Sequence, residues 1–237
     1  VLALSIALPV FASDDGDTIY INSVSDLLSL ARSCAYDQWS VGKTVILQKD
    51  LSLEGMLWEP IPSFSGQFKG NGHTVSDLTI TGQYSPAGLF GIVEEQGSIE
   101  SLSVRGVVSV SDSADTTTGG IVGINHGTLI SCQFTGVVTG DSEVGGIVGR
   151  NESEGTIDHS TARAIVTGKS STGGIAGYNL GAITGCTNVG SINTEYPEAS
   201  LDTDGFTAKM VDYINNKMAA AADDATNSVT NVATDTG

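Results

Sequence analysis

Apolar residues recur at matching places in successive stretches of this chain, and each stretch carries a glycine-rich phrase. Gly-Leu-Phe-Gly at 88–91 is followed by Gly-Gly-Ile-Val-Gly at 119–123 and 145–149, and by Gly-Gly-Ile-Ala-Gly at 173–177. The closing glycines recur every 26–32 residues, roughly, which is typical of a stacked repeat array.

Superimposing these stretches places aliphatic residues in three columns. The members are Leu89, Ile121, Ile147 and Ile175; Ile99, Leu129, Ile157 and Ile183; and Val108, Val138, Val166 and Ile192. Each period therefore holds three short strand-like runs of about 4–6 residues, broken by Gly, Asn, Asp or Ser, with no helical periodicity between them. Three strands in a turn of about 26–28 residues predict an all-β parallel β-helix whose interior is lined by these columns.

An asparagine follows each Gly-Gly-Ile phrase, two residues past its last glycine, at positions 125, 151 and 179. An asparagine at a coil corner tolerates left-handed backbone and can hydrogen-bond the turn of the next coil. We therefore interpret this column as a structural ladder, and a set of ligand groups is the alternative.

Both ends of the array depart from the strand pattern. Residues 25–32 begin with a capping residue, Ser25, and carry leucines at helical spacing before a strand-like run at 43–47, which predicts a short helix that closes the first coil. Near the other end, Thr203 or Asp204 could cap a helix with apolar positions at Phe206, Met210, Ile214 and Met218.

The domain organisation follows from these signals. The first twelve residues are apolar and end in a small residue, which indicates the remnant of a secretory signal peptide, with a buried first strand as the alternative. The predicted segments are 1–12 (signal remnant), 13–80 (cap and entry coil), 81–194 (repeats), 195–232 (helical insertion or linker) and 233–237 (start of a further, truncated repeat).

Several ordered motifs resemble a known family. The run Trp-Glu-Pro-Ile at 58–61, the run Phe-Ser-Gly-Gln-Phe-Lys-Gly-Asn-Gly-His-Thr-Val at 64–75 and the glycine phrases are similar to bacterial GLUG-motif repeat proteins over residues 19–194. The resemblance implies a right-handed parallel β-helix that is secreted or displayed at the cell surface, chiefly in Gram-positive bacteria. The motif also accompanies some immunoglobulin-A-cleaving peptidases, but it carries no catalytic residues to transfer.

Charge narrows the range of partners. The formal net charge is −17, and only 16% of the residues are charged, while 30 are glycine. Such acidity repels phosphate backbones and anionic lipid surfaces, so we expect neither nucleic acid nor insertion of the mature chain into a membrane.

Three cysteines raise the question of a disulfide bond in an exported protein. Cys132 and Cys186 fall in one interior column, two coils apart with Ser160 between them, which predicts a separation of roughly 9.6 Å. Because bonding requires Cα atoms within about 7 Å, we expect buried free thiols. For Cys34, near the cap, a bond to another chain is the alternative.

Residues with metal-binding or catalytic chemistry are sparse. His73, His126 and His159 show no metal-ligand spacing, and His73 lies in a Gly-Asn-Gly-His-Thr turn where hydrogen bonding within the turn is the expected role. We predict no catalytic residue, no cofactor and no resident metal.

The acidic loops before the Gly-Gly-Ile phrases are the weak exception. Stacked carboxylates in successive coils could bind calcium or act as an acid and base pair on a glycan, and the candidates are Asp112, Asp115, Asp141 and Glu143. The next coil places Lys169 at this level, so the carboxylate column stops, and no other basic residue is expected nearby.

Two functional hypotheses remain. The first is a non-catalytic surface module, a stalk or adhesin-like domain of a larger bacterial protein that contacts host or environmental glycan or protein. The second is an accessory β-helix of a secreted enzyme, either polysaccharide-active or a peptidase, whose catalytic part lies elsewhere or in the acidic loops. We favour the first because repeated columns explain most notable residues, and Tyr178 stands alone without an aromatic stripe for sugar stacking.

Overall fold

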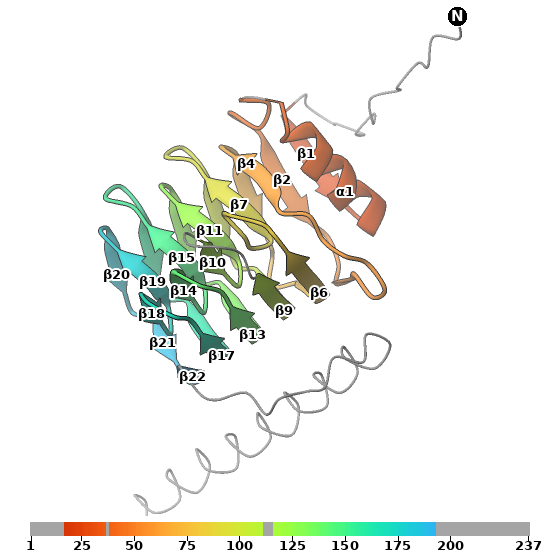
Figure 1. The fold of residues 1–237 in the computed structure, drawn as a ribbon. Coiled ribbons are helices and arrows are strands. Elements are labelled where there is room, and N and C mark those ends of the chain that lie inside the picture. Colours follow the sequence, from red (N-terminus) through yellow and green to blue (C-terminus); the bar gives the residue numbers. More distant parts are fainter. Residues whose placement is uncertain (1–16, 37, 111–115, 193–237) are drawn as a thin grey trace, which may run out of the picture. The chain divides into compact units, whose positions relative to one another are not determined.

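The chain folds as a parallel β-solenoid whose coils stack from one end to the other (Figure 1). The computed structural model describes residues 17–36, 38–110 and 116–192. The predicted signal remnant, the predicted helical insertion and the predicted further repeat at 233–237 all lie outside these residues, as do Asp112 and Asp115.

Four parallel sheets form the walls. Sheet A contains β1 (Thr18–Ile21), β2 (Thr44–Leu47), β5 (Gln67–Lys69), β8 (Ser98–Glu100), β12 (Thr128–Ile130), β16 (Thr156–Asp158) and β20 (Ala182–Thr184). Sheet B contains β3 (Leu51–Ser52), β6 (Thr74–Gly82), β9 (Ser103–Val110), β13 (Gln133–Thr139), β17 (Thr161–Thr167), β21 (Thr187–Asn188) and β22 (Ser191–Ile192). Sheet C contains β4 (Ile61–Phe64), β7 (Phe90–Val93), β11 (Val122–Asn125), β15 (Val148–Asn151) and β19 (Ala176–Asn179), and sheet D contains β10 (Thr117–Gly119), β14 (Glu143–Gly145) and β18 (Thr172–Gly173).

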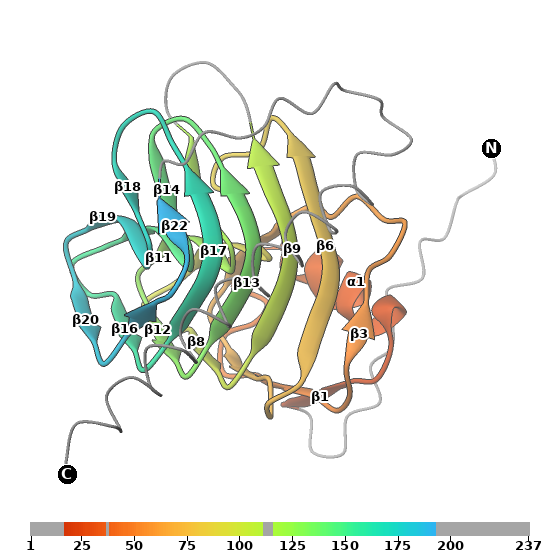
Figure 2. The same cartoon turned by 90° about the horizontal axis from the view of Figure 1, so that it is seen from below.

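Each sheet is built from one strand per coil in fixed register. Figure 2 shows β6, β9, β13 and β17 of sheet B side by side as successive layers. Ile99, Leu129, Ile157 and Ile183 are direct partners along sheet A, and Val108, Val138, Val166 and Ile192 are direct partners along sheet B. The predicted parallel β-helix and its interior columns are therefore confirmed.

The structure adds a fourth strand that the sequence did not reveal. The sequence predicted three strands per period, but at the Gly-Gly-Ile phrases the backbone turns between β10 and β11, and again between β14 and β15. An added Cβ at Gly119 would lie 2.1 Å from the carbonyl oxygen of Val122, and one at Gly149 would lie 2.6 Å from the amide of Thr118. The repeated glycines are thus needed because sheets C and D meet at a corner too tight for side chains.

The asparagine column forms the predicted ladder, but not at a left-handed corner. Asn125 and Asn151 are fully buried within strands of sheet C. Asn125 Nδ2 donates to Asn151 Oδ1 at 2.7 Å, and Asn151 Nδ2 donates to Asn179 Oδ1 at 2.8 Å. The side chains bond directly from coil to coil, so their role in the stack is structural.

Left-handed backbone occurs instead at the corner between sheets A and B. One residue per coil there has a positive φ between 46° and 62°: Asn71, Ser101, Ser131, His159 and Gly185. The amide of each non-glycine member from Ser101 onward donates to a carbonyl of the next coil at 2.9 Å. These inter-coil bonds compensate for a conformation that costs about 1–2 kcal/mol in a non-glycine residue.

A helix packs at the β1 end of the solenoid, as predicted. Helix α1 (Val24–Ser33) is one residue longer at each end than expected, and its N-cap is Ser23, not Ser25. The Ser23 hydroxyl accepts from the amide of Asp26 at 3.2 Å. Leu27 and Leu30 are fully buried in the same core as the first strands, and Figure 1 shows α1 beside β1 and β4.

The three cysteines are free thiols, as expected. Cys132 and Cys186 occupy one column with Ser160 between them. Two hydrogen bonds show this arrangement: Cys132 N donates to Ser160 Oγ, and Ser160 N donates to Cys186 Sγ. Burial raises the pKa of the Cys34 and Cys132 thiols to about 12, and it also raises the pKa of Cys186. Cys34 is 3% exposed, which disfavours its pairing with another chain.

Thiol labelling will check this burial. At pH 8, we expect Cys34 and Cys132 of the folded protein to react with a soluble disulfide reagent roughly 1,000-fold more slowly than the same thiols in urea, because the thiolate is the nucleophile. Cys186, which is only partly buried, should react faster than the other two. Mass spectrometry of digested, labelled protein measures each site, and rapid labelling of Cys132 in folded protein would contradict the stacked column.

Candidate functional site

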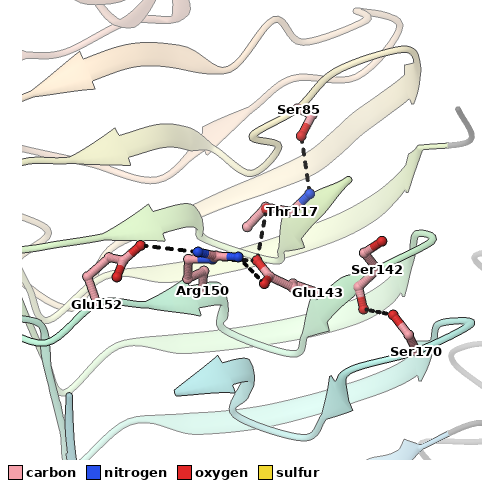
Figure 3. Close-up of polar contacts among 7 residues, drawn as sticks. All are labelled: Ser85, Thr117, Ser142, Glu143, Arg150, Glu152 and Ser170. Atoms are coloured by element: carbon pink, nitrogen blue, oxygen red, sulfur yellow. Dashed lines mark hydrogen bonds and ion pairs between the residues drawn. The ribbon is translucent and has the colours of Figure 1, made fainter. Parts of the chain in front are cut away.

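The most developed polar cluster among the described residues lies where sheets C and D meet. Glu143 opens β14, and Arg150 lies in β15 on the other side of the tight glycine corner. Arg150 Nε donates to Glu143 Oε2 at 2.6 Å, and its Nη2 contacts the second carboxylate oxygen (Figure 3). Arg150 therefore forms a bidentate ion pair with Glu143, in which two guanidinium nitrogens each contact one carboxylate oxygen. This is the strongest ordinary geometry for such a pair.

Neighbouring coils complete this cluster. From the preceding coil, Thr117 Oγ1 donates to Glu143 Oε2 at 3.1 Å, and the amide of Thr117 donates to Ser85 Oγ at 3.2 Å (Figure 3). Arg150 Nη1 also lies 3.6 Å from Glu152 Oε1. The cluster thus links three successive coils on the outer surface.

The neighbouring carboxylates stabilise the charged form of Arg150. Hydrogen bonding to Glu143 is the main cause of the raised pKa of Arg150, and the charge of Glu152 adds to it. The Glu143 side chain is 12% exposed and the Arg150 side chain is 37% exposed. Because both carboxylate oxygens of Glu143 are occupied, this residue is poorly placed to exchange a proton with a substrate.

Arg150 also contacts the aromatic ring that the sequence left isolated. Its guanidinium carbon lies 5.2 Å from the centroid of the Tyr178 ring in the next coil, within the range of a cation–π contact. These two residues continue an outward-facing column on sheet C that begins with Ser63, Ile92 and Ile124. Tyr178 therefore belongs to a mixed apolar, cationic and aromatic column.

The second described candidate carboxylate is held by a different cation. Lys169 Nζ lies 2.5 Å from Asp141 Oδ1, and the amide of Asp141 donates to Thr116 Oγ1 at 2.8 Å. The expectation that Lys169 would be the one basic residue near these loops is wrong, because Arg150 reaches Glu143 across the corner. A calcium ion at Asp141 or Glu143 would have to displace a bound cationic side chain.

Two of the three histidines, His73 and His159, pair with carboxylates. His73 Nδ1 lies 3.2 Å from Asp50 Oδ1, and His159 Nδ1 lies 2.8 Å from Asp158 Oδ1. Hydrogen bonds to Asp50 lower the pKa of its carboxyl group; the amide of Thr74 makes the largest contribution and the side chain of His73 the next largest. The ring of His73 thus bonds to the preceding coil, while its amide donates to the carbonyl of Gly70 at 2.9 Å within the turn, as expected. Within residues 17–36, 38–110 and 116–192, no three His, Cys, Asp or Glu side chains gather as a metal site would require.

Comparison with protein families identifies the repeat. The family described as "The GLUG motif" matches residues 140–167, which form one complete coil through β14, β15, β16 and β17. The coils before and after it share its register strand by strand. The GLUG motif thus corresponds to one coil of this solenoid.

Two curated relatives carry similar coils. Halomucin of Haloquadratum walsbyi is 30% identical over 155 residues, which is 60% of this chain but 2% of halomucin. A protein of Evansella cellulosilytica named "Putative Gly-rich membrane protein" is 29% identical over 137 residues, which is 42% of this chain and 16% of that protein. This chain thus spans a small part of each relative, and both relatives have names typical of surface-type proteins.

One solved structure has a similar backbone fold over most of this chain. It is described as a "putative immunoglobulin A1 protease" from Bacteroides ovatus, with a TM-score of 0.49 and 15% sequence identity over 78% of this chain and 80% of that chain. Among the helices in the described residues, none is long and apolar enough to cross a membrane.

Proposed function

We propose that this chain is a non-catalytic extracellular or cell-surface module, which serves as a stalk or adhesin-like interaction domain of a larger protein. The observation that carries this proposal is the continuous stack of coils. Sheet A runs without interruption through seven strands from β1 to β20. At about 4.8 Å per strand, six steps span roughly 29 Å.

Rigidity follows from how neighbouring coils are joined. In the middle of the stack, each coil forms parallel ladders with the next on four sheets. The buried asparagine ladder and the apolar columns join the same coils from inside. Bending the stack would break several of these contacts at once, so the module suits a spacer that holds other domains apart.

The carboxylates of the cluster support a non-catalytic role. Glu143 is engaged by Arg150 and Thr117, and Asp141 is engaged by Lys169. A glycan-cleaving pair would need one carboxyl group that holds a proton and another that is open to a water molecule or to the sugar. The alternative of an accessory β-helix in a secreted enzyme remains, with its catalytic part outside these coils.

The proposal also includes a location at the cell surface and the binding partners of the module. The names of the relatives, a mucin and a membrane protein, support a surface setting. The net charge of −17 favours neutral glycans or proteins over nucleic acid and anionic lipid. The column that ends in Arg150 and Tyr178 offers stacking and hydrogen-bonding groups to such a partner. Secretion and a Gram-positive source stay predictions.

Spin-label distances test the stalk. Thr44 and Ala182 occupy one outward column of sheet A, five strand spacings apart. With Thr44→Cys and Ala182→Cys labelled in a Cys186→Ser background, we expect a narrow distance distribution whose backbone component is about 24 Å. Serine suits position 186 because Ser160 already occupies that column.

A matched pair and an activity assay control this measurement. Moving the first label to Gln67, one coil closer, should shorten the backbone distance by about 4.8 Å without broadening the distribution. A broad distribution for both pairs would exclude a rigid stalk. Cleavage of a polysaccharide by the unmodified chain, abolished by Glu143→Gln, would establish the enzymatic alternative instead.

A further inference from the structure

The asparagine ladder has a direction. Each ladder asparagine donates one Nδ2 proton to a glycine carbonyl of its own coil: Asn125 to Gly127, Asn151 to Gly155 and Asn179 to Gly181. The other Nδ2 proton of Asn125 and of Asn151 goes to the Oδ1 of the next coil's asparagine. The central residue, Asn151, therefore accepts from the preceding coil and donates to the following one.

The two ends of this ladder leave different groups without a hydrogen-bond partner in the described residues: an acceptor at one end and a donor at the other. Asn125 Oδ1 is buried and has no hydrogen-bond partner, because the preceding coil presents Val93 at this level. At the other end, the Oδ1 of Asn179 is occupied, and one of its Nδ2 protons has no partner within the described part of the chain. The ladder thus terminates in an acceptor toward β1 and in a donor toward β20.

The apolar columns also remain open at the β20 end. Ile157 and Val166 are fully buried, whereas their partners one coil later, Ile183 and Ile192, are 37% and 41% exposed. Strands β18, β19 and β20 are the last members of sheets D, C and A. Within the described residues, this edge therefore combines unpaired strands, exposed core residues and a spare amide donor.

From this continuity with the coil-to-coil interface, we infer that the β20 edge is a docking surface for one further GLUG coil of the same polypeptide, entering by its N-terminal side. The incoming coil must place an asparagine opposite Asn179, so that its Oδ1 accepts the spare proton. It must also cover Ile183 and Ile192 with aliphatic residues. The inference rests on the stalk proposed above and specifies how that stalk is extended.

A second copy of the chain does not meet these requirements. Its β1 end is covered by helix α1, where Leu27 and Leu30 are buried against the first coil. Two copies meeting through their β20 edges would bring donor against donor at Asn179 and would pair the strands antiparallel. Extension is therefore directional, and the capped end cannot act as the incoming partner.

An insertion in the full-length chain tests this inference. Because Val138, Val166 and Ile192 are register partners, a second copy of residues 139–166 placed after Ile192 would start in the correct phase. We expect hydrogen exchange of the amides in β19 and β20 to slow by at least about tenfold, since a new ladder would cover them. The melting temperature should also rise.

Two controls separate docking from mere lengthening. An insert of the same residues in scrambled order should leave exchange in β19 and β20 unchanged. Replacing the inserted counterpart of Asn151 by leucine should remove part of the protection. Failure of the native-order insert to fold, or equal exchange with both inserts, would overturn the inference.

A substitution at the edge gives an independent readout. Ile183→Lys should lower the melting temperature little in the parent chain, where this side chain is 37% exposed, and much more in the inserted chain, where it would be buried. Equal effects in both chains would contradict docking. Because spin-label distances are measured in the parent chain, failure here would leave the stalk proposal standing.

Discussion

Gly136→Ala should be among the most damaging single substitutions in this protein, lowering the free energy of unfolding by about 3–5 kcal/mol. Gly136 has a φ of +151°, and a Cβ there would lie 1.8 Å from the carbonyl oxygen of Gly106 in the preceding coil. No rotamer relieves this overlap, because the obstructing atom belongs to the backbone. Two coils would have to separate at the centre of sheet B.

The same column provides a matched control. Gly106, Gly136 and Ala164 are register partners, and Ala164 carries a Cβ without a positive φ. Ala164→Gly should therefore cost only about 0.5–1 kcal/mol, the usual penalty of glycine within a strand. Urea denaturation followed by circular dichroism measures both changes. Comparable losses for the two variants would show that the close approach of Gly136 to Gly106 does not exclude a side chain at this position.

The interior of the fold was predictable because it obeys a simple rule. Strand residues that face the core must be apolar, and stacking repeats them at one register, so Ile99, Leu129 and Ile157 could be aligned before any geometry was known. The asparagine ladder was predictable for the same reason. A polar residue that recurs at one register in a buried array must bond to its own kind or to the adjoining backbone.

The corners were not predictable by the same reasoning. Two of the left-handed positions are Ser101 and Ser131, a residue type without a strong preference for positive φ. Their conformation is imposed by hydrogen bonds to the next coil, which only the stacked structure supplies. The split between β10 and β11 was missed because glycines permit both an extended run and a tight turn.

The candidate site was predicted only in part, because a partner on the adjoining strand was overlooked. Glu143 and Asp141 were identified as stacked carboxylates, but Arg150 was not assigned to them. Strand alternation contained the missing clue: the ladder residue Asn151 faces the interior, so its neighbour Arg150 must face outward on the same strand. The tight corner then brings it back toward Glu143, and this folding-back depends on backbone geometry that the sequence pattern does not specify.

Loss of the central ladder residue is the second large effect that we expect. Asn151→Leu removes the acceptor for Asn125 Nδ2, the donor to Asn179 Oδ1 and the donor to the carbonyl of Gly155. Leucine is close to asparagine in size, so the cost comes mainly from polar groups left unpaired. At about 1–3 kcal/mol for each buried group, partly relieved at the exposed Asn179 end, the free energy of unfolding should fall by about 2–4 kcal/mol.

The size of this effect depends on the position of the asparagine in the ladder. A substitution of the end residue, Asn179, can demonstrate this. Asn179→Leu removes only the acceptor for Asn151 and one bond to Gly181, and Asn179 is already exposed. Its cost should be about 1 kcal/mol. In the double variant, Asn151 and Asn179 no longer form a pair, so the two losses should sum to more than the measured total. Strict additivity in urea denaturation would mean that the ladder acts as separate side chains, and the directional extension inferred from it would lose its basis.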